Sequence, residues 1–198
     1  MSLKEETFFY VILFVVLGIS FKMFLDSDAY NLTCIVSTVD GEKYCVRENA
    51  QLDKSADLLA TVAGKCKNLV LFMKKKYPDR DDVDRLHKGF SSTKITETLP
   101  TSTLTAYSEN KGKKIAFCLN KKKNGTELID MNTLTFVAIH ELSHIMTLSV
   151  GHKQEFWENF KFLLEGATEL GVYTPEDYKK KPAEYCSMMI NDNPYYDI

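Results

Sequence analysis

The sequence carries little net charge and no closely spaced pairs of cysteines. Its 25 Lys and Arg residues and 27 Asp and Glu residues leave a formal net charge of −2, so the overall balance does not attract nucleic acid. Short runs of lysine occur without interleaved aromatic residues, and a solvated surface is their ordinary explanation. The five cysteines lack the paired spacing of a zinc ribbon. These absences argue against nucleic acid as a partner and against a cysteine-ligated metal.

Histidine is also scarce, with four in 198 residues. Two of the four belong to one His-Glu-x-x-His motif, formed by His140, Glu141 and His144. Chance would produce roughly 0.006 such pentapeptides in a chain of this composition. Residues four apart lie on the same face of a helix, so both imidazoles can reach one metal ion, and Glu141 is placed to act as a base on water. Gly151 and His152 follow as a helix stop that carries a third imidazole.

The segment around the motif is apolar on nearly every side, which predicts a buried helix. Two histidines and a glutamate in such a helix cost free energy unless something satisfies them. A zinc ion would do so, and the alternative is a pair of core histidines hydrogen-bonded to the backbone. The apolar residues are Leu134, Phe136, Val137, Ile139, Leu142, Ile145, Met146 and Leu148.

The run HELSHIMTLSVGHKQEFW resembles the active-site stretch of small single-domain zincins of the SprT, YgjP-like and WLM kind. A wider pattern includes KYCVRE, TAYSENKGKKIAFCL and a late EYC. It is similar to zinc metallopeptidases encoded by large DNA viruses of the algal-virus type. The resemblance covers most of residues 43–190. It implies a zincin-like α+β fold, one zinc ion per chain and peptidase activity on a polypeptide substrate.

The resemblance also bears on the third metal ligand. Its Gly-His-x-x-x-Phe-Trp motif favours His152 beside His140 and His144. Zincins of the thermolysin type instead take a glutamate about twenty residues past the second histidine, and Glu165 is the alternative third ligand. In either case Glu141 would take a proton from water and deliver it to the leaving amine. Three tyrosines stay open as oxyanion stabilisers: Tyr107, Tyr173 and Tyr185.

The N-terminal segment predicts a membrane anchor. Residues 7–21 contain no charge, and a helix over residues 8–25 would be about 27 Å long, close to the ~30 Å hydrocarbon core of a bilayer. Lys22 would extend its ammonium group toward the interface. A cleaved signal peptide is the rival interpretation, but Glu5 and Glu6 stand where a basic patch would be expected. The distribution of charge leaves the orientation open.

Two hairpins are expected. Residues 32–47 alternate and break at Asp40-Gly41; Cys34 and Cys45 would then lie near each other, and two packed thiols are slightly favoured over a disulfide. Residues 105–119 form the second hairpin. Its second arm is the candidate edge strand that pairs with an extended substrate, with an interior strand as the equal alternative. This arm comprises Ile115, Ala116, Phe117, Cys118 and Leu119.

Helical spacing is expected over residues 50–77, 79–88 and 153–169, followed by an irregular tail. The predicted organisation is an anchor over residues 1–28, a β-hairpin connector over 29–49 and a zincin-like α+β domain over 50–198. The predicted function is that of a membrane-anchored zinc-dependent peptidase of a virus. The alternative is a minor structural protein of the virion, associated with capsid or membrane, that keeps a zincin fold with little activity. The internal membrane of a large DNA virus particle, or the space between it and the capsid, is the expected location.

Overall fold

The structure is a computed structural model that describes residues 3–25, 27–90 and 94–197. Residues 1–2, 26, 91–93 and 198 belong to the predicted anchor and domain and lie outside the described residues. Helices and strands mix along the chain, which confirms the α+β class. The elements are α1 (Leu3–Leu25), α2 (Asp28–Asn31), β1 (Leu32–Val36), β2 (Lys43–Arg47), α3 (Leu52–Lys76), α4 (Asp81–Gly89), β3 (Ile95–Glu97), β4 (Ala106–Glu109), β5 (Lys114–Phe117), α5 (Met131–Met146), α6 (Gln154–Glu169), β6 (Ala183–Tyr185), β7 (Met188–Ile190) and the 3-10 turn η2 (Pro194–Tyr196).

The main sheet has five strands in the order β1-β2-β3-β5-β4. The outer pairs, β1 with β2 and β4 with β5, are antiparallel hairpins, whereas β2 with β3 and β3 with β5 are parallel. Parallel neighbours need a long crossover, and α3 with α4 supplies the one between β2 and β3. The expected hairpins over residues 32–47 and 105–119 are therefore confirmed.

Of the two alternatives for residues 115–119, the structure has the interior strand and not the edge strand. Strand β5 lies between β3 and β4, and Ile115 to Leu119 are at most 1% exposed. The apolar run that suggested a strand is apolar because it is covered on both faces, as interior strands are. The strand at this edge is β4, the more polar first arm of the hairpin.

The β1–β2 hairpin, predicted as a connector, belongs to the main sheet. Strand β2 pairs with β3, and Tyr44 and Val46 are buried in the core. Cys34 lies directly opposite Cys45 and the two form a disulfide, so the preference for packed thiols is wrong. Three positions further along the hairpin, the backbone N–H of Ser37 donates to the carbonyl oxygen of Glu42. Register alternation makes Cys34 and Cys45 a non-hydrogen-bonded pair, where side chains approach most closely.

Helix α5 is the centre of the domain and contacts α3, α4, α6 and β4. Its apolar residues face these neighbours on most sides, which accounts for the absence of a polar stripe in its sequence. Asp130 caps its start by accepting hydrogen bonds from the backbone N–H (2.9 Å) and hydroxyl (2.7 Å) of Thr133. The expected helices over residues 50–77, 79–88 and 153–169 appear as α3, α4 and α6.

The turn between β4 and β5 packs closely against the ends of α4 and α5. Gly112 has a φ of +100°, and a Cβ there would lie 2.2 Å from the carbonyl oxygen of Gly89. Gly89 in turn approaches the carbonyl oxygen of Lys111 and the side chain of Ile145. Both positions need glycine, one for its backbone conformation and both for the close approach. This contact fixes the turn next to the end of the motif helix.

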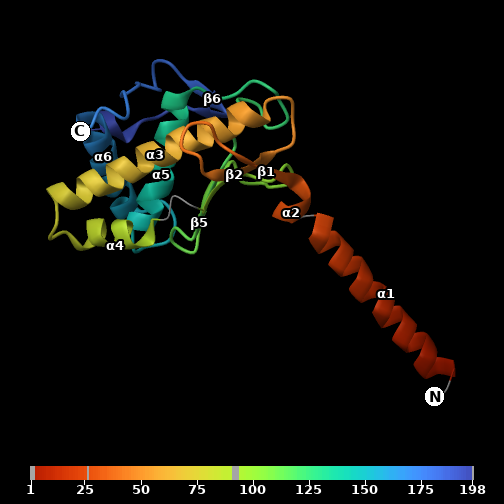
Figure 1. Ribbon diagram of the computed structural model, residues 1–198. Coiled ribbons are helices and arrows are strands. Elements are labelled where there is room, and N and C mark those ends of the chain that lie inside the picture. Colours follow the sequence, from red (N-terminus) through yellow and green to blue (C-terminus); the bar gives the residue numbers. More distant parts are fainter. Residues whose placement is uncertain (1–2, 26, 91–93, 198) are drawn as a thin grey trace.

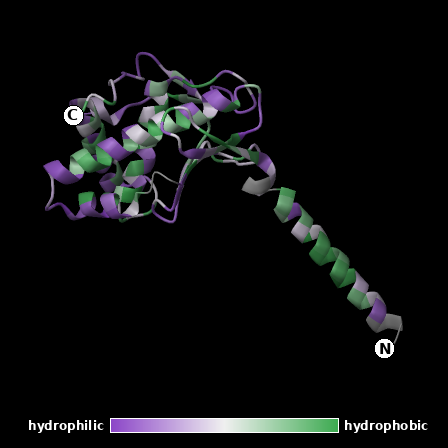
Figure 2. Ribbon diagram, viewed as in Figure 1, coloured by the Kyte–Doolittle hydropathy of each residue, from purple (hydrophilic) through white to green (hydrophobic). Residues whose placement is uncertain are grey.

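Helix α1 extends away from the rest of the molecule (Figure 1). It is apolar along most of its length, as the green ribbon in Figure 2 shows, and its large apolar side chains from Phe8 to Phe24 are exposed. Among the described residues, Glu6–Leu25 is the one helical stretch that is long and apolar enough to cross a membrane by length and composition. A signal sequence passes the same test.

Candidate active site

Helix α5 presents the motif residues His140, Glu141 and His144 to a cleft of about 810 Å³. The lining of the cleft begins one turn earlier on α5, with Phe136 and Val137. Glu141 is 4% exposed, whereas both imidazoles are only partly buried. The motif therefore forms the floor of an open cleft, as helical spacing predicts.

The third imidazole comes from the loop between α5 and α6. Gly151 adopts a φ of +82° there, a conformation that favours glycine, and His152 follows it. One ligand nitrogen from each of His140, His144 and His152 can be chosen so that all three lie within 4.8 Å of one another. The Nε2 atoms of His140 and His152 are 3.1 Å apart. The structure thus brings together the three histidines that the sequence singled out.

This donor set fits a zinc ion. Bonds of about 2.0–2.1 Å at tetrahedral angles place two ligand nitrogens about 3.3 Å apart. Burial, assisted by the charges of His144 and His152, lowers the pKa of His140 to about 3. Burial, His152 and Lys111 lower the pKa of His144 to about 4. Both imidazoles are therefore neutral at pH 7, and neutral imidazole is the form that binds a metal.

Phe156 of α6 packs against all three imidazoles. It is fully buried, and its ring centroid lies 4.8 Å from that of His140, 4.4 Å from that of His144 and 4.6 Å from that of His152. Aromatic contacts at this range restrict ring orientation. The Phe-Trp part of the sequence motif thus places an apolar ring beneath the histidine cluster.

Glu141 is held by the edge strand. Burial raises the pKa of its carboxyl group to about 8, and a hydrogen bond from the backbone N–H of Ser108 opposes this rise. Strand β4 therefore contacts the predicted base directly, which the sequence does not indicate because Ser108 has no local relation to the motif.

The end of α5 is held by two cations. The ammonium group of Lys111 donates to the carbonyl oxygens of His144 (3.0 Å) and Thr147 (2.7 Å), and the guanidinium group of Arg85 donates to that of Met146. The last carbonyls of a helix have no partner within the helix, and positive charge is favourable there. These contacts fix the turn from which the loop to His152 departs.

The loop itself is held by α6. The carboxylate of Glu155 accepts hydrogen bonds from the backbone N–H groups of Leu148 (2.9 Å) and Ser149 (3.1 Å). The indole Nε1 of Trp157 donates to the carbonyl oxygen of His152 at 3.1 Å. His152 is exposed, so these contacts, and not burial, position its backbone.

Glu165 does not join the cluster. It is exposed on α6 and belongs neither to the histidine group nor to the lining of the cleft within the described residues. Of the three tyrosines, Tyr107 and Tyr185 line the cleft. The Tyr185 hydroxyl donates to the carbonyl oxygen of Thr105 and accepts from the N–H of Cys118, while Tyr173 packs against Phe136.

A third hairpin, which the sequence did not predict, forms one wall of the cleft. The tail forms the two-stranded β6–β7 hairpin, whose turn is joined to the end of β5 by a disulfide between Cys118 and Cys186. The sequence does not indicate a partner for Cys118, because disulfide connectivity does not follow from the spacing of cysteines. Cys66, the free thiol among the described residues, is buried, and burial raises its pKa to about 12.

Comparison with known proteins places these features in a family. A family model described as the WLM domain matches residues 84–192, more than half of the chain. An uncharacterised protein of Acanthamoeba polyphaga mimivirus is 25% identical over 163 residues, which cover 80% of this chain and 82% of that protein. An uncharacterised protein of Invertebrate iridescent virus 6 is 39% identical over 75 residues, which cover 37% of this chain and 41% of that protein.

A third relative, an uncharacterised protein of Invertebrate iridescent virus 3, is 33% identical over 101 residues. The match covers 50% of this chain and 57% of that protein. Among solved structures, the crystal structure of Wss1 from Saccharomyces cerevisiae aligns with a TM-score of 0.49 and 19% identity. That alignment covers 64% of this chain and 88% of the other.

Proposed function

Because this chain belongs to the WLM family of zinc metallopeptidases, we propose that it hydrolyses peptide bonds in the cleft above α5, with His140, His144 and His152 as zinc ligands. The observation that carries the proposal is the convergence of three imidazoles next to a buried glutamate in an open cleft. The relatives belong to large DNA viruses, and we propose a viral origin for this chain too.

Each residue of the site has a separate task. When bound, zinc would polarise the scissile carbonyl and make water more acidic. Glu141 accepts the proton of the attacking water and delivers it to the leaving amine. A cation bound by the three imidazoles would lower the pKa of the Glu141 carboxyl group, because nearby positive charge favours the ionised form. Phe156 keeps the imidazole rings in place while this occurs.

Strand β4 is suited to hold the substrate backbone. The N–H of Cys118 donates to the carbonyl oxygen of Thr105, and antiparallel pairing alternates from that pair. Residues 105, 107 and 109 therefore direct their backbone groups to β5, whereas Ala106 and Ser108 direct theirs to the open edge. The Ser108 N–H reaches Glu141. A peptide that pairs with this edge by β-augmentation would run past Glu141, the proposed base.

Metal analysis of the purified full chain tests the site. About one zinc ion per chain is expected, and combined replacement of His140 and His144 by alanine should abolish stoichiometric binding. His87 lies on α4, outside the histidine cluster, and His87→Ala serves as the matched control that keeps the metal. Stoichiometric zinc in the double variant would show that the metal is held elsewhere.

The alternative function, a structural virion component with a zincin fold, predicts a closed site. The cleft is open beside the three histidines, and a free position next to the metal is characteristic of catalytic sites, whereas structural sites are closed. This observation supports catalysis. Association with capsid proteins stays a separate proposal about location, and proteomics of purified particles tests it.

We further propose that α1 anchors the domain in a bilayer. Its exposed apolar surface supports this, and the two disulfides support a domain on an oxidising side of the membrane, because thiols are kept reduced in the cytosol. After alkaline carbonate extraction the full chain should stay in the membrane pellet, and a variant that lacks residues 1–25 should be soluble. A mature chain that begins after residue 25 would instead identify α1 as a cleaved signal sequence.

A further inference from the structure

Exposed apolar side chains gather around the cleft. Outside α1, eleven large apolar side chains are exposed among the described residues, and five of these line the cleft. Scattered exposed apolar residues are normal, but a contiguous group marks a binding surface. The five residues are Leu104, Val150, Trp157, Met188 and Met189.

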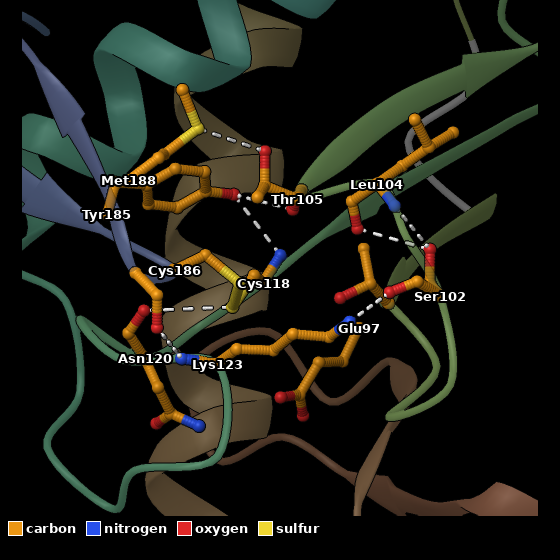
Figure 3. The surroundings of a disulfide bond; sticks show 12 residues. Glu97, Ser102, Leu104, Thr105, Cys118, Asn120, Lys123, Tyr185, Cys186 and Met188 are labelled. Carbon is orange, nitrogen blue, oxygen red and sulfur yellow. Dashed lines mark hydrogen bonds between the residues drawn. A yellow bond between two sulfur atoms is a disulfide. The ribbon is translucent and has the colours of Figure 1, made fainter.

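Three of the five, Leu104, Met188 and Met189, belong to the wall formed by the start of β4 and the β6–β7 hairpin. The two elements meet at Thr105, whose hydroxyl lies 3.4 Å from the sulfur of Met188 and whose carbonyl oxygen accepts a hydrogen bond of 3.0 Å from Tyr185. Figure 3 shows Met188, Tyr185 and Thr105 side by side. We name this wall, together with Val137 on the floor, the apolar pocket.

The hairpin is fastened at its turn, so the pocket has a fixed wall. The Cys118–Cys186 disulfide joins the turn to the end of β5 (Figure 3). Cys186 and Ser187 have φ values of 50° and 65°, and their N–H groups donate to the carbonyl oxygens of Asn120 (3.0 Å) and Lys121 (2.7 Å). Residues far apart in the sequence thus hold Met188 next to β4.

The pocket lies close to the reacting centre. Val137 precedes Glu141 by four residues, or about 6 Å along the helix axis, and both line the same cleft. An extended peptide advances about 3.4 Å per residue. In a peptide paired with β4, the side chain that enters the pocket would therefore lie within about two residues of the scissile bond.

We propose that this pocket selects polypeptide substrates with a large apolar side chain beside the scissile bond, an inference that rests on the proposed peptidase function. Met188 and Leu104 are its specificity-determining residues. Methionine is unbranched and polarisable and adapts to side chains of different shape, so the pocket selects for size and apolarity and not for one residue type.

Peptide binding to zinc-loaded Glu141→Gln protein separates this inference from catalysis. The probes are fluorescein-labelled ten-residue peptides of Ser, Gly and Lys in which a single Leu is moved along the chain, with the all-polar peptide as reference. Fluorescence anisotropy should show about tenfold tighter binding when Leu stands at one or two central positions, the gain expected for burying one such side chain. Met188→Ser and Leu104→Ser should each reduce this preference.

Leu71→Ser is the matched control, because Leu71 is exposed on α3 and lies outside the lining of the cleft; it should keep the full preference. Equal binding of Leu-containing and polar peptides, or a preference that survives both pocket substitutions, would overturn the inference. Cleavage of the same peptides by the unsubstituted chain is an independent measurement. If the protein binds Leu-containing peptides more tightly but cleaves none, the peptidase proposal is contradicted and the pocket is not. If it cleaves peptides but binds Leu-containing and polar peptides equally, the pocket is contradicted and the peptidase proposal is not.

Discussion

Glu141→Gln is expected to reduce the rate of peptide hydrolysis by about 10²- to 10⁴-fold, the usual contribution of a positioned general acid–base group. Glutamine has nearly the same shape as glutamate but cannot accept the proton of the attacking water. Its amide oxygen can still accept the hydrogen bond that the Ser108 N–H gives to Glu141. Zinc content and the far-ultraviolet circular dichroism spectrum should therefore stay unchanged while turnover of a quenched-fluorescence peptide falls.

Glu165→Gln is the matched control. The same chemical change on the exposed face of α6 should leave zinc binding and turnover as they were. A loss of zinc in this control would instead support Glu165 as a ligand. If the Glu141→Gln protein turned over peptides as fast as the unsubstituted chain, Glu141 could not be the base. Loss of zinc together with activity would assign Glu141 to metal binding.

The site could be predicted from sequence because its parts are close together in the chain. His140, Glu141 and His144 are fixed by the geometry of a single helix. His152 follows after one glycine-dependent turn, and Phe156 lies in the first turn of α6. No long-range pairing is needed to bring these residues together, so the motif names His140 and His144, and the family resemblance favours His152 over Glu165 as the third ligand.

The walls of the cleft could not be predicted in this way. Both arms of the 105–119 hairpin have strand patterns, and which arm lies at the edge depends on β3, which pairs with β5 from residues 95–97. Residues 115–119 have the stronger apolar pattern because the strand is buried on both faces, and not because it lies at the edge that would pair with substrate. The tail has an irregular pattern because β6 and β7 have three residues each. Their position depends on Cys118 and Tyr185, contacts that local sequence does not encode.

Removal of the Cys118–Cys186 disulfide is expected to have the largest effect on stability. The bond closes a loop over a sequence separation of 68 residues, and the chain-entropy relation gives about 4 kcal/mol for a loop of this length. The Cys34–Cys45 bond, with a separation of 11, should contribute about 3 kcal/mol by the same relation. The order of the two arises because a longer closed loop removes more conformations from the unfolded chain.

The measurement is urea-induced unfolding of the full chain in detergent micelles, followed by circular dichroism of the domain. Cys118→Ser with Cys186→Ser should lower the free energy of unfolding more than Cys34→Ser with Cys45→Ser does. Addition of reductant to the unsubstituted chain should approach the sum of both losses, while a chain without all four cysteines should not respond. Reductant insensitivity of the unsubstituted chain would contradict the disulfides themselves, and with them the oxidising compartment. The variant with Cys118→Ser and Cys186→Ser should also show a smaller difference in affinity between Leu-containing and all-polar peptides, because the disulfide that stabilises the domain also holds Met188 against β4.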